Sequence, residues 1–209
     1  METMFRRTVR HGRIRQLSDE ELARLPEYRA VNDTINHTIG FVPNSARTIA
    51  RWPALAEGFR ELAAAMREAV DTLPTGLANL IHLVASQAAG CTYCQAHGAV
   101  TTIAHGVPEE KLAAIWEFES SDLCEERERA ALRLAAAAAV SPSAVTDQMM
   151  EDLHTLFDGE DVVRIVGVIA ISGFMNRWNA TAAKKLDDIA VSAAENRLAP
   201  GGWSIGIHG

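Results

Sequence analysis

The chain has 209 residues, of which 48% are hydrophobic and 22% charged, a composition typical of a globular protein with one domain or two small ones. Its formal net charge of −7 argues against a nucleic-acid partner, because contacts with phosphates need a concentrated basic surface. No uncharged apolar stretch reaches the roughly 18 residues that would demand a membrane. Alanine is abundant and only 6% of residues are aromatic, so an all-α fold is favoured.

The first part of the chain, residues 1–31, predicts an N-terminal arm followed by a short helix. The basic run Arg6–Arg15 is followed by no apolar segment or cleavage site, so we expect a solvated or partner-contacting arm rather than a targeting signal. Ser18 and Glu21 have the spacing of a capping box, which predicts a helix over residues 19–25.

Apolar periodicity predicts the next two helices. Pro53 suits the first turn of a helix that runs to about residue 69. Four apolar residues recur there at helical spacing and should face the core: Leu55, Phe59, Leu62 and Met66. Residues 77–89 are apolar almost throughout and predict a buried helix, which Gly90 ends.

Two of the three cysteines follow Gly90 with CxxC spacing. If a helix begins at Cys91, both Cys91 and Cys94 lie in its first turn, where free N–H groups and the helix dipole favour a thiolate. His97 follows on the same helix face. The pattern indicates a dithiol with an acid/base group beside it. An odd number of cysteines does not suit a disulfide scaffold, so we expect transient disulfide chemistry in the cytoplasm.

After residue 120 the pattern of helices begins again. A short helix over residues 108–116 closes the first group, and helices over residues 125–140, 146–157 and 161–179 form the second. Two successive groups of helices suggest two similar halves, residues 45–119 and 120–190, packed as one helical domain over residues 32–190. Residues 191–209 are expected to form an irregular, Gly-rich tail.

Four segments of the chain carry a resemblance to a known family: GFVPN at residues 40–44, ASQAAGCTYCQAH at 85–97, RERAALRLA at 127–135 and FMNRWN at 174–179. Together they resemble the alkylhydroperoxidase AhpD-like branch of the carboxymuconolactone decarboxylase family. The resemblance covers roughly residues 40–188. It implies an AhpD-like helical fold and a homo-oligomer, a trimer or a hexamer. It also implies a thiol peroxidase, because the decarboxylases of the family lack the dithiol.

The resemblance assigns a role to each cysteine. Cys94 would be the thiolate that attacks an organic hydroperoxide, Cys91 would close the disulfide, and His97 would help to move protons. An external dithiol would then reduce the disulfide. Two positions depart from the AhpD pattern: the histidine expected four residues after the second cysteine is Gly98, and the glutamate expected twelve residues before the first cysteine is Asn79.

His82 is a candidate for the missing base. Asn79, His82 and Ser86 form a polar line on an otherwise apolar helix, and buried polar groups need partners. Such partners would exist if the line faced the dithiol. His82 is therefore either a general base or a core histidine bonded to a backbone carbonyl. An apolar lining should admit organic hydroperoxides better than charged substrates; we expect it from Leu77, Leu80, Ile81 and Val84.

Three alternatives stay open at this point. The cysteines, with His97 and either His82 or His105, could bind zinc, although His97 follows Cys94 more closely than in a zinc finger. A non-redox decarboxylase or isomerase could use a histidine as base, with the cysteines incidental. A helical assembly module could sense oxidants without turnover. The peroxidase, the decarboxylase and the sensor need no metal, haem or flavin cofactor.

Five further residues are assigned mainly structural roles. Tyr93 should pack over the dithiol rather than donate a proton, and Cys124 should be a bystander. Glu128 belongs to a solvated helix start or anchors a charge pair inside the second half. Asn176 and Asn179 should tie helices or protomers together.

Overall fold

A computed structural model describes residues 12–25 and 42–209, so most of the predicted arm and the segment 26–41 lie outside the described residues. The described residues form helices joined by turns, with no β-strand, and the fold is all-α as predicted. The α-helices are α1 (Asp19–Ala23), α3 (Asn44–Ile49), α4 (Pro53–Thr72), α5 (Leu77–Ala88), α6 (Thr92–Ala104), α7 (Glu109–Ala113), α8 (Glu126–Ala139), α9 (Asp147–Leu156), α10 (Gly159–Ala182) and α11 (Asp188–Arg197). Short 3-10 helices cover Ile115–Glu117, Ala199–Gly201 and Gly206–His208.

The predicted capping box is present at α1. The Ser18 hydroxyl accepts the Glu21 N–H at 3.2 Å, and the Glu21 carboxylate accepts the Ser18 N–H at 2.8 Å. Two N–H groups that the first turn would leave without a partner are thereby satisfied, which explains why the helix begins at Asp19.

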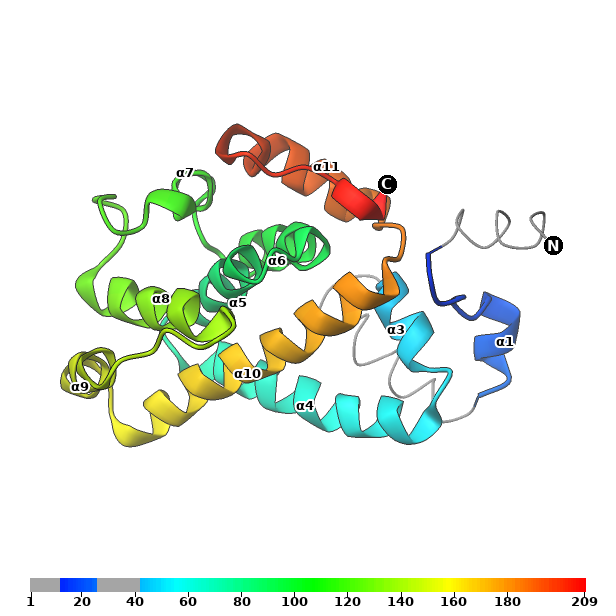
Figure 1. Cartoon of the computed structure of the whole chain (residues 1–209), viewed down its shortest axis with the longest axis horizontal. Coiled ribbons are helices and arrows are strands. Elements are labelled where there is room, and N and C mark those ends of the chain that lie inside the picture. Colours follow the sequence, from blue (N-terminus) through cyan, green and yellow to red (C-terminus); the bar gives the residue numbers. More distant parts are fainter. Residues whose placement is uncertain (1–11, 26–41) are drawn as a thin grey trace.

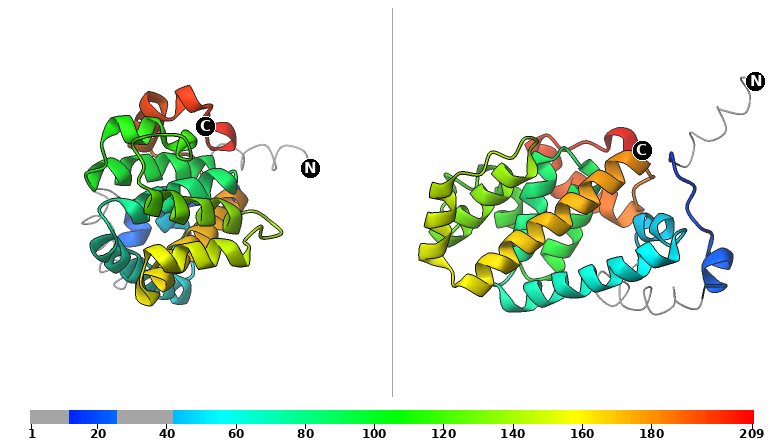
Figure 2. Two further views of the ribbon diagram at one scale, coloured as in Figure 1. Left: turned by 90° about the vertical axis from the view of Figure 1, so that its left-hand side faces the viewer. Right: turned by 60° about the horizontal axis from the view of Figure 1, so that its bottom comes forward.

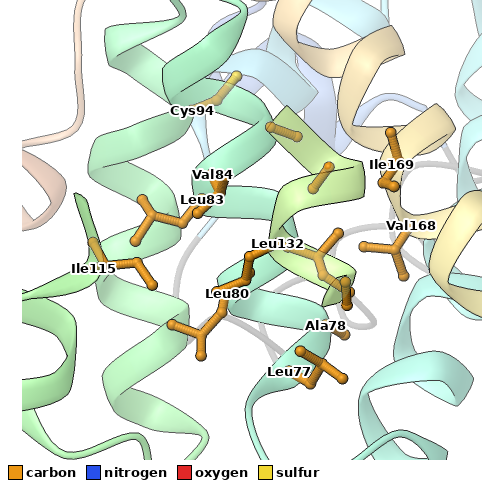
Figure 3. Packing of buried hydrophobic residues seen from close by; sticks show 14 of the residues in the cluster. Leu77, Ala78, Leu80, Leu83, Val84, Cys94, Ile115, Leu132, Val168 and Ile169 are labelled. Carbon is orange, nitrogen blue, oxygen red and sulfur yellow. The ribbon is translucent and has the colours of Figure 1, made fainter. Parts of the chain in front are cut away.

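The core is organised around α5. This helix packs against α6, α8 and α10, and its leucines are fully buried among apolar side chains of these neighbours (Figure 3). Each large side chain buried there stabilises the fold by about 1.5–3 kcal/mol. Four apolar residues of α5 are almost completely buried in this core: Leu77, Leu80, Ile81 and Val84.

The remaining helices form two sides around α5 and α6. In Figures 1 and 2, α4 and α10 run along one side, and α11 covers α6 from the other. Cys94 lies at one end of the labelled core residues in Figure 3. The beginning of α6 therefore lies where α5, α10 and α11 converge.

One predicted apolar stripe is partly wrong. Leu62 on α4 is 42% exposed, while Phe59 and Met66 line a cavity instead of filling the core. The buried residues of α4 are the small Ala56 and Ala69. The reason lies in the tertiary structure. A cavity separates α4 from α6 and α10, so Phe59 and Met66 face this cavity instead of packing against the core.

The end of the chain is more ordered than expected. The helix α11 continues to Arg197, so the irregular tail predicted from residue 191 is wrong over its first residues. Beyond it, the Trp203 indole donates to the Thr92 carbonyl at 3.0 Å, and the His208 ring donates to the Lys184 carbonyl at 2.7 Å. These bonds fix the last residues against the start of α6.

The predicted division into two halves falls between the 3-10 helix Ile115–Glu117 and α8. Across it, α5 packs closely on α8, and Lys111 donates to both oxygens of the buried Glu128 at 2.6 and 2.7 Å. Glu128 therefore pairs with the first half, whereas we predicted a solvated helix start or a partner inside the second half. The similarity of the two halves stays a prediction.

Among the described residues, no helix combines the length and hydropathy needed to cross a membrane.

Candidate active site

The dithiol lies at the start of α6. Gly90 has a φ of +69°, a conformation that side chains disfavour, and it ends the preceding segment as predicted. Cys91 occupies the N-cap position, and its sulfur accepts the Cys94 N–H at 3.3 Å. The two sulfurs are 2.6 Å apart with no disulfide between them, and only 1–2% of each residue is exposed. The pair is thus in direct contact inside the protein.

The two thiols differ in acidity. The hydrogen bond between the two sulfurs lowers the pKa of Cys91, although burial opposes the shift. Burial raises the pKa of Cys94 well above its ordinary value, and the contact with Cys91 adds to this rise. The two opposite pKa shifts favour a thiolate at Cys91 over one at Cys94. This differs from the resemblance, which implies a thiolate at Cys94.

A chain of polar contacts leads from Cys94 into α10 and the segment after it. The Asn179 Nδ2 donates to the Cys94 sulfur at 3.3 Å, and the Asn179 Oδ1 accepts from Lys184 Nζ at 2.8 Å. Lys184 has no exposed surface, and its ammonium lies over the rings of Tyr93 and Trp178 at 5.5 and 5.8 Å from their centroids. Asn179 was expected to tie helices or protomers together, and its contact joins α10 to α6 at the dithiol itself.

His97 belongs to a second network. Its Nε2 lies 3.0 Å from Asp187 Oδ2, and its Nδ1 lies 3.0 Å from the Tyr93 carbonyl oxygen. The Tyr93 hydroxyl donates to the same carboxylate at 3.1 Å and accepts the Ser45 N–H. Burial raises the pKa of Tyr93 well above its ordinary value, so the phenol keeps its proton. Tyr93 is buried, lines the cavity and helps to hold Asp187 through its hydroxyl; that it shields the dithiol stays a prediction.

His82 faces α10 rather than the hydrocarbon core. Its Nδ1 lies 2.8 Å from the Ser172 hydroxyl, which donates to the Val168 carbonyl at 2.7 Å. Burial lowers the pKa of His82 to about 4, so the imidazole is neutral at neutral pH. A Cβ at Gly98 would lie 3.4 Å from the His82 ring and 3.2 Å from Leu83. The glycine thus lets His82 and Leu83 pack closely against α6.

The polar line of α5 meets a polar line of α10. The Ser86 hydroxyl donates to Asn176 Oδ1 at 2.9 Å, so Asn176 ties the two helices together as predicted. Asn79 occupies the place of the glutamate in the AhpD pattern, and its Nδ2 has no hydrogen-bond partner among the described residues. Asn79 and His82 of the α5 line share the cavity with Cys94, and His82 also bonds to the Cys94 backbone, whereas Asn179 of the α10 line contacts the Cys94 sulfur.

A cavity of about 470 Å³ opens beside the site. Cys94, His82 and His97 line it, whereas Cys91 does not. Its apolar surface includes side chains from α4 and α10: Phe59, Met66 and Val70 from α4, with Ile171 and Met175 from α10. The apolar lining predicted from α5 is therefore wrong, because those four side chains pack into the interior.

Two functional residues were missed by the sequence analysis. Lys184 and Asp187 each stand in a doublet, Lys184-Lys185 and Asp187-Asp188, that looks like a solvated connection between helices. In the structure the first member of each doublet turns inward, while the second members pair with each other near the surface at 3.7 Å. The two doublets were the sequence signal that could have identified this segment as part of the site, although they do not reveal which residue of each doublet is buried.

The remaining candidates lie apart from this arrangement. Cys124 lines no part of the cavity, and burial raises the pKa of its thiol. His105 reaches the cavity at the far end of α6 and bonds to the Thr101 carbonyl. Within residues 12–25 and 42–209, no three histidine, cysteine or carboxylate side chains converge as metal ligands. The zinc alternative finds no ligand set there.

Comparison with known proteins identifies relatives of the whole fold. The model of the carboxymuconolactone decarboxylase family matches residues 53–137. The debrominase Bmp8, as a cysteine-to-alanine variant in complex with 2,3,4-tribromopyrrole, shares 30% identity over 88% of this chain and 96% of its own, with a TM-score of 0.81. The unliganded debrominase shares 31% identity over 86% and 95% of the two chains, with a TM-score of 0.79.

A second relative is a peroxidase-related protein from Ralstonia eutropha JMP134 with an alkylhydroperoxidase AhpD core. It shares 26% identity over 84% of this chain and 93% of its own, with a TM-score of 0.66. A search of curated proteins gives no significant match.

Proposed function

Because the chain belongs to the carboxymuconolactone decarboxylase family and has its AhpD-like fold, we propose that it is a CxxC-dependent thiol peroxidase that reduces organic hydroperoxides. One observation carries the proposal: two reduced sulfurs lie in contact, and only that of Cys94 faces a largely apolar cavity. A cavity of this size and lining suits an organic molecule better than hydrogen peroxide.

In the first step Cys94 attacks the terminal oxygen of the hydroperoxide. Its proton passes to Cys91, so that the thiolate forms at the sulfur that meets the substrate. The O–O bond breaks, Cys94 becomes a sulfenic acid, and the alkoxide leaves. His97 supplies the proton that converts the alkoxide into an alcohol, since it lines the cavity and is held by Asp187.

In the second step Cys91 attacks the sulfenic sulfur. The S–O bond breaks, the hydroxide takes the proton from Cys91 and leaves as water, and the disulfide closes. The dithiol has then given two electrons to the peroxide. An external dithiol returns them by thiol–disulfide exchange, and a reducing compartment such as the cytoplasm supplies such a reductant.

His82 acts in this scheme as the base that replaces the missing glutamate. Its neutral ring lines the cavity beside Cys94, and it takes the Cys94 proton in place of Cys91 in molecules whose Cys91 is already protonated. Replacing His82 with Gln should raise the apparent pKa of the Cys94 thiol, measured by the pH dependence of alkylation. An unchanged value would remove His82 from the mechanism and leave it as a packing residue.

We also propose a homo-oligomer, a trimer or a hexamer. Val163 and Val166 on α10 are 71% and 45% exposed, and a second copy would cover them. Light scattering after size-exclusion chromatography measures the assembly directly. A monomer at micromolar concentration would contradict this part of the proposal.

The peroxidase is tested by adding one equivalent of cumene hydroperoxide to the reduced protein. We expect a Cys91–Cys94 disulfide by thiol-specific mass analysis, one equivalent of cumyl alcohol, and turnover when dithiothreitol is added. The control is Cys124→Ser, which should behave as the wild type. Thiols that stay reduced in the presence of the hydroperoxide would contradict the proposal.

Reductive dehalogenation is a second candidate, favoured by the debrominase that shares 30% identity across nearly its full length. The same dithiol could attack the bromine of a brominated pyrrole, with a proton taking its place on the ring carbon. Cys91 would then displace bromide from Cys94 and close the disulfide. Two electrons again pass from the dithiol. Bromide released from brominated pyrroles, with no consumption of hydroperoxide, would favour this reaction over the first.

A further inference from the structure

We propose that Lys184 and Asn179 act as a positioning pair that transfers the negative charge of the dithiol from Cys91 to Cys94. The proposal deepens the dithiol function proposed above and rests on it. It addresses a conflict in the site, because Cys94 faces the cavity, whereas the Cys91 sulfur accepts the backbone N–H at the start of α6.

The orientation of the Asn179 amide is fixed by Lys184. An ammonium group has only donors, so the amide oxygen must face Lys184, and that contact measures 2.8 Å. The amide nitrogen must then point the other way, to the Cys94 sulfur at 3.3 Å. If the amide were reversed, its oxygen would repel a thiolate and its N–H groups would face a cation.

The pair changes the balance between the two sulfurs. A thiolate at Cys91 is stabilised by the Cys94 N–H and by the first turn of α6. A thiolate at Cys94 loses these contacts, and Asn179 is its hydrogen-bond donor apart from the neighbouring thiol. The change itself requires only that the proton on Cys94 cross 2.6 Å to Cys91. No net charge moves into or out of the site.

Several titratable groups surround the Lys184 ammonium. The two cysteines come from α6, Asp187 from the segment before α11, and His208 from the end of the chain. Tyr93 lies below the ammonium and keeps its proton. Burial lowers the pKa of Lys184 to about 8, although the thiols and Asp187 oppose the shift. The positioning effect should therefore fade above pH 8, where Lys184 loses its charge.

A structural role alone would not require a cation at this position. Lys184 makes no ion pair with a carboxylate within the described part of the chain, and methionine has a similar length and an apolar character that suits a buried site. The adjacent Lys185 is exposed and forms a surface pair with Asp188. Lys185 therefore provides a matched control on the same segment.

The test is alkylation of the reduced full-length protein by iodoacetamide between pH 6 and 10, with mass mapping of each cysteine. The wild type should react at Cys94, with a rate that rises with pH and then falls away above pH 8. Lys184→Met should slow the reaction at Cys94 about tenfold at pH 7 and remove the inflection near pH 8. Lys185→Met should match the wild type.

A second variant separates the donor from the cation. Asn179→Asp keeps a partner for Lys184 and removes the N–H that faces Cys94, so the rate at Cys94 should fall at least as far as in Lys184→Met. Wild-type rates and pH profiles in both variants would overturn the proposal. Because alkylation needs no hydroperoxide, a protein that fails as a peroxidase while showing these changes would disprove the peroxidase and retain the positioning pair.

Discussion

The protein buries two lysines in very different surroundings. Lys111 donates to both oxygens of Glu128 at 2.6 and 2.7 Å, and that carboxylate also caps α8 through the Glu125 N–H at 2.8 Å. Lys184 is more deeply buried, and its direct hydrogen-bond partner is a neutral amide. The first cation forms a salt bridge with a carboxylate, whereas the second forms none within the described residues.

The difference separates structure from chemistry. A buried ion pair with complete hydrogen bonding holds two helices in register, and removing one partner is costly. A buried cation without a direct salt bridge costs stability, and such an arrangement is typical of functional sites, where shifted pKa values serve the reaction. The comparison therefore predicts that substitutions around Lys184 change reactivity, while substitutions around Lys111 change stability.

The largest effect is expected from Cys94→Ser. The hydroxyl is a far weaker nucleophile than a thiolate, so the rate of hydroperoxide reduction should fall at least about 1,000-fold. The free energy of unfolding should change by less than about 1 kcal/mol, because serine keeps the shape of the side chain. Peroxide consumption and urea denaturation measure the two quantities. Residual turnover above one tenth of the wild-type rate would show that the reaction does not need Cys94.

Glu128→Ala should produce the opposite result. The substitution leaves Lys111 without its anion and removes the cap of α8, so the free energy of unfolding should fall by about 4 kcal/mol. Activity per folded molecule should stay unchanged. Glu126→Ala is the matched control on the same helix, because that carboxylate is exposed and its surface pairs contribute under about 1 kcal/mol. Equal losses in the two variants would contradict the structural role of the buried pair.

Sequence patterns were sufficient for the elements and for the dithiol. The apolar run over residues 77–89, the break at Gly90 and the CxxC spacing are local features, and each depends on a few neighbouring residues. The same is true of the capping box at Ser18 and Glu21. These predictions are confirmed because hydrogen bonding within one or two turns decides them.

The rest of the site depends on contacts between distant segments. Ala183 ends α10 with a φ of +44°, and this turn directs Lys184 inward while Lys185 faces solvent. Nothing in the local pattern distinguishes the two lysines. The cavity lining likewise follows from how α4 lies over α6 and α10, so periodicity alone could not show that Phe59 and Met66 face a cavity.

The pH dependence of stability provides a third way to distinguish the candidate active site from the region around Lys111 and Glu128. The His82 ring bonds to a serine hydroxyl rather than a carboxylate, and burial lowers its pKa from 6.5 to about 4. Between these values the unfolded chain binds a proton that the folded chain does not. His82 should therefore remove up to about 3 kcal/mol of stability as the pH falls from about 6.5 to 4.

The variant His82→Gln should remove this part of the pH dependence. The control is His154→Gln, because His154 is exposed on α9 and its loss should leave the slope unchanged. Urea denaturation at several pH values gives the slope for each protein. An identical slope in His82→Gln and the wild type would show that the ring is already accessible to protons in the folded state.

The smallest effect is expected from Lys184→Met. Its free energy of unfolding should exceed that of the wild type by about 1–2 kcal/mol at pH 7. Burial lowers the pKa of Lys184 from 10.5 to about 8, so the folded state holds a cation that water would solvate better. The unpaired Asn179 oxygen offsets part of the gain. The advantage should shrink as the pH rises from 8 to 10.5, because the lysine in the unfolded chain then also loses its proton. Lys111→Met should instead destabilise the protein, and a loss of stability in both variants would place Lys184 with Lys111 as a structural residue.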